Sequence, residues 1–151
     1  MAATDVLWVL TGSLAHAIQG VPVEPHDIDI MTDQRSAYEM ERHFAGSVIR
    51  RVMFAEAEII RSHFGALLID GVKVEIMGDL QKRLEDGTWE SPIDLLEHRR
   101  FVIREGARIP VLPLEYEYGA YIRLGRHERA MMLRTWLDDH PALLQESQES
   151  H

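Results

Sequence analysis

The chain has no cysteine among its 151 residues. This absence excludes disulfide bonds and metal sites built on thiolates. Basic residues are few as well: 16 lysines and arginines stand against 25 aspartates and glutamates, and the formal net charge is −9 at pH 7. Proteins dedicated to nucleic acids normally present a basic face, so the charge argues against that class. It is compatible with a nucleotide that is delivered together with magnesium.

Long apolar runs are also missing, and no stretch has the length needed to cross a membrane. Residues 1–5 lack the basic start of a signal peptide. Together with the absence of cysteine, these features favour a cytoplasmic protein that does not bind membranes. Hydrophobic residues make up 46% and charged residues 27%, as is usual for a globular protein. We expect a single domain over residues 1–151, with a core at about 6–85 and a C-terminal helical extension at about 90–140.

The pattern of apolar residues predicts an α/β (α+β) fold, in which a mixed β-sheet is flanked by helices and carries a C-terminal hairpin and two helices. Asp70-Gly71 is a strong signal for a turn between two strands, and Glu105-Gly106 suggests a second hairpin. Predicted strands cover residues 6–10, 27–31, 47–54, 63–69, 72–77, 100–104 and 108–112. Predicted helices cover residues 13–17, 34–44, 78–84, 113–124 and 126–137, with Ser13 as the N-cap of the first.

Acidic residues alternate with isoleucines in the second predicted strand, where Asp27 and Asp29 are separated by Ile28. Residues two apart on a strand point to the same face, so we expect both carboxylates to project together. Glu75 lies on the polar face of the predicted strand 72–77. If the two strands are neighbours, three carboxylates converge, and a hard divalent cation such as Mg²⁺ relieves their repulsion. Two such ions can clamp the attacking and leaving oxygens of a phosphoryl displacement.

A glycine-serine turn, Gly12-Ser13, precedes these acids. Glycine permits unusual backbone dihedrals and a close approach of another group. Ser13 begins a short predicted helix whose free N–H groups favour an anion, and its hydroxyl can donate to a phosphate oxygen. On its own, a glycine-serine turn more often marks the start of a helix than a phosphate-binding site. Combined with the acids, it predicts a site for metal-dependent nucleotidyl transfer.

The order of these motifs resembles the nucleotidyltransferase superfamily typified by DNA polymerase beta. The resemblance lies in Gly12-Ser13, then His26-Asp27-Ile28-Asp29-Ile30, then the strand acid Glu75, and it covers roughly residues 6–80. It is closer to the minimal members and to small antibiotic adenylyltransferases of the lincosamide type. It implies transfer of a nucleoside monophosphate from a nucleoside triphosphate such as ATP to a hydroxyl of a small molecule, a protein or a tRNA end.

The same resemblance implies roles for individual residues. Gly12 and Ser13 contact the triphosphate, and Asp27 and Asp29 bind metal. Glu75 is the third metal ligand or the general base. The implied cofactor is a pair of Mg²⁺ ions, with Mn²⁺ as the alternative.

Two further residues are candidates for binding phosphate. His26 either orients Asp27 or touches a phosphate. Lys73 shares the predicted strand face of Glu75, so it pairs with that acid, attracts phosphate or is simply a solvated lysine. A zinc site is disfavoured, because the separations of the best candidates match no zinc-site spacing; these candidates are His16, His26 and His63.

The C-terminal part departs from the family pattern. Tyr121 stands near the place of a lysine, and residues 126–129 read Arg-His-Glu-Arg in place of an Arg-x-Lys-Asp run. This departure favours a second reading, a non-catalytic or regulatory nucleotide-binding module that could belong to a toxin–antitoxin pair. A hydrolase or another metal enzyme that uses the same acids is a third reading.

Overall fold

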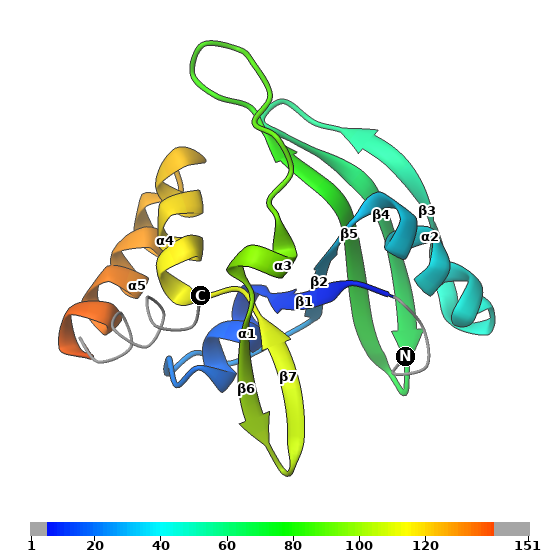
Figure 1. Ribbon diagram of the computed structural model, residues 1–151, viewed down its shortest axis with the longest axis horizontal. Helices are drawn as coiled ribbons and strands as arrows, with labels where there is room; N and C mark the ends of the chain where they lie inside the picture. The colour runs from blue at the N-terminus through cyan, green and yellow to red at the C-terminus, as the bar shows by residue number, and fades with distance from the viewer. Residues whose placement is uncertain (1–5, 141–151) are drawn as a thin grey trace.

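The computed structural model describes residues 6–140. A seven-stranded mixed sheet runs through it in the order β3-β4-β5-β2-β1-β7-β6 (Figure 1). The strands are β1 (Trp8–Thr11), β2 (Ile28–Thr32), β3 (Val48–Glu56), β4 (Ile60–Ile69), β5 (Val72–Lys82), β6 (Arg100–Arg104) and β7 (Ala107–Val111). The helices are α1 (Gly12–Ile18), α2 (Gln34–His43), the 3-10 helix η1 (Ala45–Ser47), α3 (Leu95–His98), α4 (Leu114–Arg123) and α5 (His127–Asp139). The predicted α/β class, a mixed sheet flanked by helices, is confirmed.

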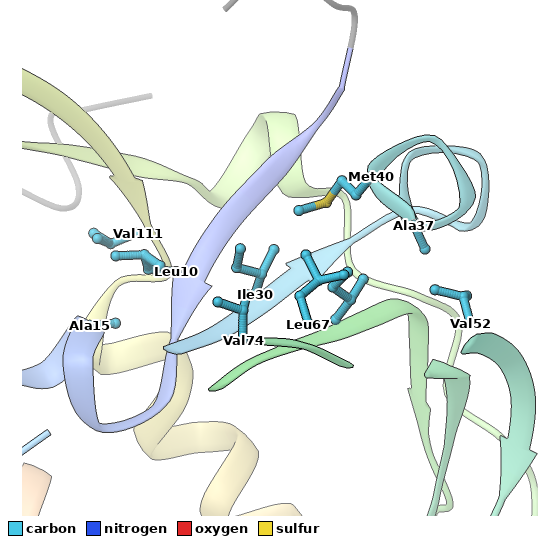
Figure 2. Close-up of a cluster of buried hydrophobic side chains, with 10 residues drawn as sticks. Leu10, Ala15, Ile30, Ala37, Met40, Val52, Leu67, Val74 and Val111 are labelled. Carbon is cyan, nitrogen blue, oxygen red and sulfur yellow. The ribbon is translucent and has the colours of Figure 1, made fainter. Parts of the chain in front are cut away.

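Both faces of the central strands are covered in part by helices, because apolar residues alternate between the two faces. One face packs against α1 and α2, and Figure 2 shows this core, which includes Leu10, Ala15, Ile30, Ala37, Met40, Leu67, Val74 and Val111. The other face carries a second core, in which Leu95 of α3 packs with Val9, Met31, Leu80 and Leu112. In β1 and β2 the residues of the two cores are adjacent in sequence, Val9 beside Leu10 and Met31 beside Ile30, as alternation requires.

Two tight turns fold the strands back on themselves, as the sequence predicts. Asp70 and Gly71 connect β4 to β5 with φ values of 51° and 78°. Glu105 and Gly106 connect β6 to β7 with φ values of 50° and 78°. Positive φ at both central residues is the requirement of a type I′ hairpin turn.

The predicted helix at residues 78–84 is wrong. In the structure β5 continues through this segment to Lys82 and remains paired with β4. Asp79 has φ 50°, and the pairing register shifts by one residue between Arg61 and His63 of the partner strand. A β-bulge of this kind adds one residue to a strand without ending it. The Gly78-Asp79 pair therefore marks the bulge and not a helix start.

The predicted N-cap at Ser13 is also wrong, because the N-cap of α1 is Thr11, two residues earlier, and the helix begins at Gly12. The other long helices begin close to their predicted positions. Asp33 caps α2, where its side chain accepts a hydrogen bond of 2.7 Å from the backbone N–H of Ser36. Pro113 precedes α4, in agreement with the preference of proline for helix starts.

The C-terminal hairpin extends the sheet of the predicted core, because β7 pairs in parallel with β1. The two last helices, α4 and α5, lie side by side at one end of the molecule (Figure 1). They enclose a third core of Val21, Leu114, Leu133 and Leu137. The ends of the predicted domain, residues 1–5 and 141–151, lie outside the described residues. Within residues 6–140, no helix is both long and apolar enough to cross a membrane.

Candidate active site

Three adjacent strands bring two of the predicted acids together. Thr11 of β1 pairs with Asp29 of β2, and Asp29 pairs in turn with Glu75 of β5. Neighbouring strands lie about 4.8 Å apart, and residues paired in register point to the same face. Asp29 and Glu75 are therefore side by side on the sheet. Asp27 precedes β2 by one residue and lines the same cavity as Asp29.

Asp29 is the acid most affected by its surroundings. Burial is the main cause that raises its pKa, and the negative charges of Glu75, Asp27 and Glu117 raise it further. Lys73 partly offsets these effects, and the pKa of Asp29 reaches about 6. Ionising a carboxyl with such a pKa costs free energy, and a bound cation would offset this cost by favouring the charged form.

Gly12 makes room for Asp29. Its φ is 71°, in the region that favours glycine, and a Cβ atom at this position would overlap Oδ2 of Asp29. Any other residue would strain the backbone and displace the carboxylate. The close approach predicted for this glycine is thus a contact with the aspartate.

A cavity of about 420 Å³ opens beside these residues. The backbone N–H of His26 lies 3.4 Å from Oγ of Ser13, to which it donates, so the two residues hold the cavity's rim together. The lining residues are Gly12, Ser13, His16, Val23, His26, Asp27, Asp29, Tyr121, Arg129 and Met132. Four residues predicted to bind phosphate or metal, besides Gly12, therefore meet here or border it: Ser13, His26, Asp27 and Asp29.

Lys73 lies outside this set. Its Nζ is 3.0 Å from Oε1 of Glu75, and the hydrogen bond and charge of that acid raise the pKa of Lys73. Of the three alternatives for Lys73, the structure shows the pairing with Glu75. It does not bring Lys73 to the lining of the cavity that holds Ser13 and His26.

The donor set suits a hard cation, although the described part of the chain contains no ready-made group of three His, Cys, Asp or Glu side chains that could hold an ion. Mg²⁺ is commonly bound by one or two carboxylates and completed by water and substrate phosphates. Asp27 and Asp29 provide such oxygen donors at one cavity, and the crowded charge at Asp29 favours a cation. The residues present thus fit Mg²⁺, and Mn²⁺ has the same preference for oxygen ligands.

Glu117 of α4 is a site residue that the sequence reasoning missed. It is only 3% exposed, and its Oε1 accepts hydrogen bonds from the hydroxyl of Thr11 and from the N–H of Gly12, the latter 3.1 Å long. The N–H of Gly12, the first residue of α1, is therefore not free for an anion. A glutamate within a helix gives no sequence signal for such a contact.

His16 completes the buried contact beneath the turn. Its Nε2 lies 2.5 Å from Oε2 of Glu117, within ion-pair distance, but the ring is not aligned for a regular hydrogen bond. His16 is 4% exposed and lines the 420 Å³ cavity. It belongs to the site through Glu117, and no zinc-binding group forms around it within residues 6–140.

The C-terminal helices close the site. Tyr121, near the position where the family pattern has a lysine, lines the cavity, and burial raises its pKa to about 12. Arg129 of α5 lies 6.0 Å from the centroid of the Tyr121 ring and lines the same cavity. Arg129 thus occupies the position of the last residue of the Arg-x-Lys-Asp run and brings a positive charge to the cavity.

Comparisons with known proteins identify the family and the fold of the chain. A family model of aminoglycoside-2''-adenylyltransferases matches residues 1–132. The crystal structure of TM1012 from Thermotoga maritima, whose assignment as a nucleotidyltransferase is provisional, is 59% identical in sequence with a TM-score of 0.80, covering 93% of this chain and 87% of that one. A search of curated proteins gave no significant match.

A second solved structure supports the fold alone. The lincosamide antibiotic adenylyltransferase LnuA, with lincomycin bound, is 12% identical with a TM-score of 0.58, covering 88% of this chain and 89% of that one. The family match and the fold both agree with the resemblance seen in the sequence. The chain belongs to the aminoglycoside-2''-adenylyltransferase family and has the fold of small nucleotidyltransferases.

Proposed function

We propose that this protein transfers a nucleoside monophosphate, such as AMP from ATP, to a hydroxyl group of an acceptor, with Mg²⁺ or Mn²⁺ as cofactor. One observation carries the proposal: Asp29 pairs in register with Glu75 and lies against Gly12, at the cavity that Asp27 and Ser13 also line. This arrangement supplies oxygen donors for metal-bound phosphates and an acid beside them.

Each residue has a separate task at this site. Asp27 and Asp29 hold the cation. Gly12 leaves space for the Asp29 carboxylate, and Ser13 donates its hydroxyl to a phosphate oxygen. Mg²⁺, when bound, neutralises the charge of the phosphates and aligns them. Arg129, which lines the same cavity, adds positive charge near the phosphates.

Glu75 acts on the acceptor. It takes the proton from the acceptor hydroxyl, whose oxygen forms a bond to the α-phosphorus of the nucleotide. The bond between this phosphorus and the bridging oxygen breaks, and pyrophosphate leaves. Lys73, 3.0 Å from Oε1 of Glu75, holds the carboxylate in position. In-line positioning and charge neutralisation supply most of the rate enhancement in reactions of this class.

Thermal unfolding with Mg²⁺ and ATP tests the binding step. Mg²⁺ and ATP together should raise the midpoint of the wild type, because a ligand that binds only the folded state stabilises it by mass action. Asp27→Asn and Asp29→Asn should lose this shift. Asp70→Asn is the matched control, since Asp70 is exposed in a hairpin turn that also accepts asparagine. A wild type without any metal-dependent shift would refute the proposal.

Transfer itself is measured with ATP labelled in its α-phosphate and a panel of hydroxyl-bearing acceptors that includes aminoglycosides and lincomycin. A labelled adduct that forms only with the metal and requires Asp29 supports the enzyme. A metal-dependent shift without any adduct favours the second reading, a nucleotide-binding module. One contact speaks for that reading: the N–H of Gly12 is already donated to Glu117.

A further inference from the structure

A second cavity, of about 290 Å³, adjoins the proposed nucleotide site and shares Gly12, Asp29, Tyr121 and Arg129 with it. It begins at Asp29 and Glu75 and extends beneath α4. Its volume is close to the lower end of the range of small-molecule sites. The two cavities meet at the acids, so a nucleotide in one and an acceptor hydroxyl in the other would meet there. The second cavity is the acceptor site if the proposed function holds.

Most of the wall of this second cavity is apolar. The apolar lining residues are Met31, Ile60, Met77, Leu80, Leu112, Ala120 and Leu124. Such a wall suits an aliphatic or aromatic body. Recognition of a ligand in an apolar cavity depends on a small number of polar groups.

Lys82 is such a polar group. It lines the second cavity and is only 5% exposed. Within the described residues, its Nζ has no ion pair or hydrogen bond; the contact it makes is with the Tyr116 ring, whose centroid is 5.6 Å away. Fully buried lysines are rare unless they are paired. Burial lowers the pKa of Lys82, so its ammonium form would be favoured by a nearby negative charge, which an anion bound in the cavity would supply.

The bulge in β5 is what brings Lys82 to this cavity. Residues seven apart on a regular strand point to opposite faces. The extra residue at Asp79 reverses the alternation, so Lys82 and Glu75 line the same cavity. Seven residues of strand span about 20 Å, which places the two side chains near opposite ends of the cavity.

The charge at the Lys82 end is positive. The charge of Glu90 raises the pKa of Lys82, but Oε2 of Glu90 lies 3.3 Å from Nε of Arg123 and pairs with that group. Lys82 and Arg123 together carry two positive charges, and Glu90 compensates one of them. Aminoglycosides, for which the family is named, are polycations, and Lys82 would repel an ammonium group at its end of the cavity, whereas Asp29 and Glu75 would attract one at the other end.

We propose that the acceptor carries a hydroxyl at one end and an anionic group, a carboxylate or a phosphate monoester, at the other, joined by an apolar body. The hydroxyl lies at Glu75, the body along the methionine and leucine side chains, and the anion at Lys82. This inference rests on the proposed function only in identifying the ligand as the acceptor of the transfer. Binding of the anion to Lys82 can be measured without any transfer.

The experiment uses four linear probes of equal chain length: ω-hydroxydecanoate, ω-hydroxydecyl phosphate, decanediol and ω-aminodecanol. Lys73 and Lys82 are the two lysines of the chain, so limited acetylation followed by mass spectrometry reports on each separately. The two anionic probes should slow the acetylation of Lys82 and leave that of Lys73 unchanged. The diol and the amine should not protect Lys82. Protection by the carboxylate or by the phosphate alone identifies which anion the site takes.

Lys82→Met provides the second measurement, because methionine fits among Met77 and Leu80 at a buried position. Calorimetry should show a loss of about 10- to 100-fold in the affinity for the anionic probes. Arg83→Met, one residue further and outside the cavity lining, is the control and should bind as the wild type does. Equal protection by all four probes, no protection by any of them, or unchanged affinity in Lys82→Met would overturn the inference.

The outcomes separate this inference from the proposed function. If Lys82 binds the anionic probes but Mg²⁺ and ATP never stabilise the protein, the anion site stands and the transferase proposal fails. If AMP is transferred to aminoglycosides or to decanediol as readily as to the anionic probes, the transferase stands and the anionic acceptor is refuted.

Discussion

Asp29 lies at the proposed active site, and its negative charge lowers the stability of the folded protein. Burial and neighbouring acids raise its pKa from 3.8 to about 6, so the folded state binds a proton more tightly than the unfolded state does. The stability that this proton contributes is present below about pH 4 and is lost as the pH rises through about 6. At neutral pH, without a metal, the charged carboxylate therefore destabilises the fold.

Asp29→Asn should consequently stabilise the metal-free protein at neutral pH. A pKa shift of this size corresponds to about 3 kcal/mol at most, and solvent screening of the half-buried group reduces it to about 1 kcal/mol. The thermal midpoint should rise by roughly 3 °C near pH 8 and by nothing near pH 4. Scanning calorimetry from about pH 4 to about pH 8 measures the difference. Asp70→Asn should show no such pH dependence, and a gain for Asp29→Asn that is constant with pH would contradict the electrostatic cause.

Addition of Mg²⁺ should make the wild type more stable than Asp29→Asn. The wild type gains stability when the cation relieves the repulsion at Asp29, and Asp29→Asn does not. A residue that costs stability without its ligand is expected at a functional site, where local stability and activity conflict.

At the scale of elements, Glu117 fastens α4 to the strand and helix that carry the glycine-serine turn. It accepts hydrogen bonds from Thr11 and Gly12, and it lies within ion-pair distance of His16. Glu117→Ala would leave a buried hydroxyl and a buried N–H without an acceptor. We expect a loss of about 2–4 kcal/mol in the free energy of unfolding.

Urea denaturation checks this loss. Glu117→Gln keeps a carbonyl oxygen in the same place, so it should lose less than the alanine variant does. Glu128→Ala, at an exposed position of α5, should change the free energy by about 0.5 kcal/mol or less. A Glu117→Ala protein as stable as Glu128→Ala would show that the tie between the elements does not matter.

The sequence predicts elements well where the signal is local. The turns at Asp70-Gly71 and Glu105-Gly106 follow from residues that tolerate positive φ. The sequence predicts a helix at Asp79 in place of the bulge, because a glycine followed by an aspartate is also a typical helix start. Only the pairing of β5 with β4 decides between the two, and that pairing is not a local property.

The site shows the same limit. Alternation alone puts Asp29 and Glu75 on the polar faces of their strands, but their side-by-side position depends on the parallel register of β2 with β5. From the sequence it stayed open whether these two strands are neighbours. Glu117 and Lys82 were out of reach, because their roles depend on the packing of α4 and on the bulge in β5.

At the scale of the whole molecule, the C-terminal part is joined to the core by several contacts. The backbone N–H of Leu112 donates to the carbonyl of Leu10 over 3.0 Å, and the side chain of Gln19 donates to the carbonyl of Leu112 over 2.9 Å. Val111 packs in the same core as Leu10. Loss of the C-terminal hairpin would expose an edge of β1 and open this core.

We therefore expect the chain to unfold as one cooperative unit, as a single domain does. Its three tryptophans allow a direct test, since Trp8 lies in β1 and Trp136 in α5. Two variants that each retain one of these two tryptophans, with the others replaced by phenylalanine, should show the same urea midpoint by fluorescence. Far-UV circular dichroism should give that midpoint as well. If Trp136 changes at a lower urea concentration while Trp8 stays native, the α4–α5 region unfolds separately. It would then be an independent lid on the site and not part of the domain, and both cavities would lose a wall before the sheet itself unfolds.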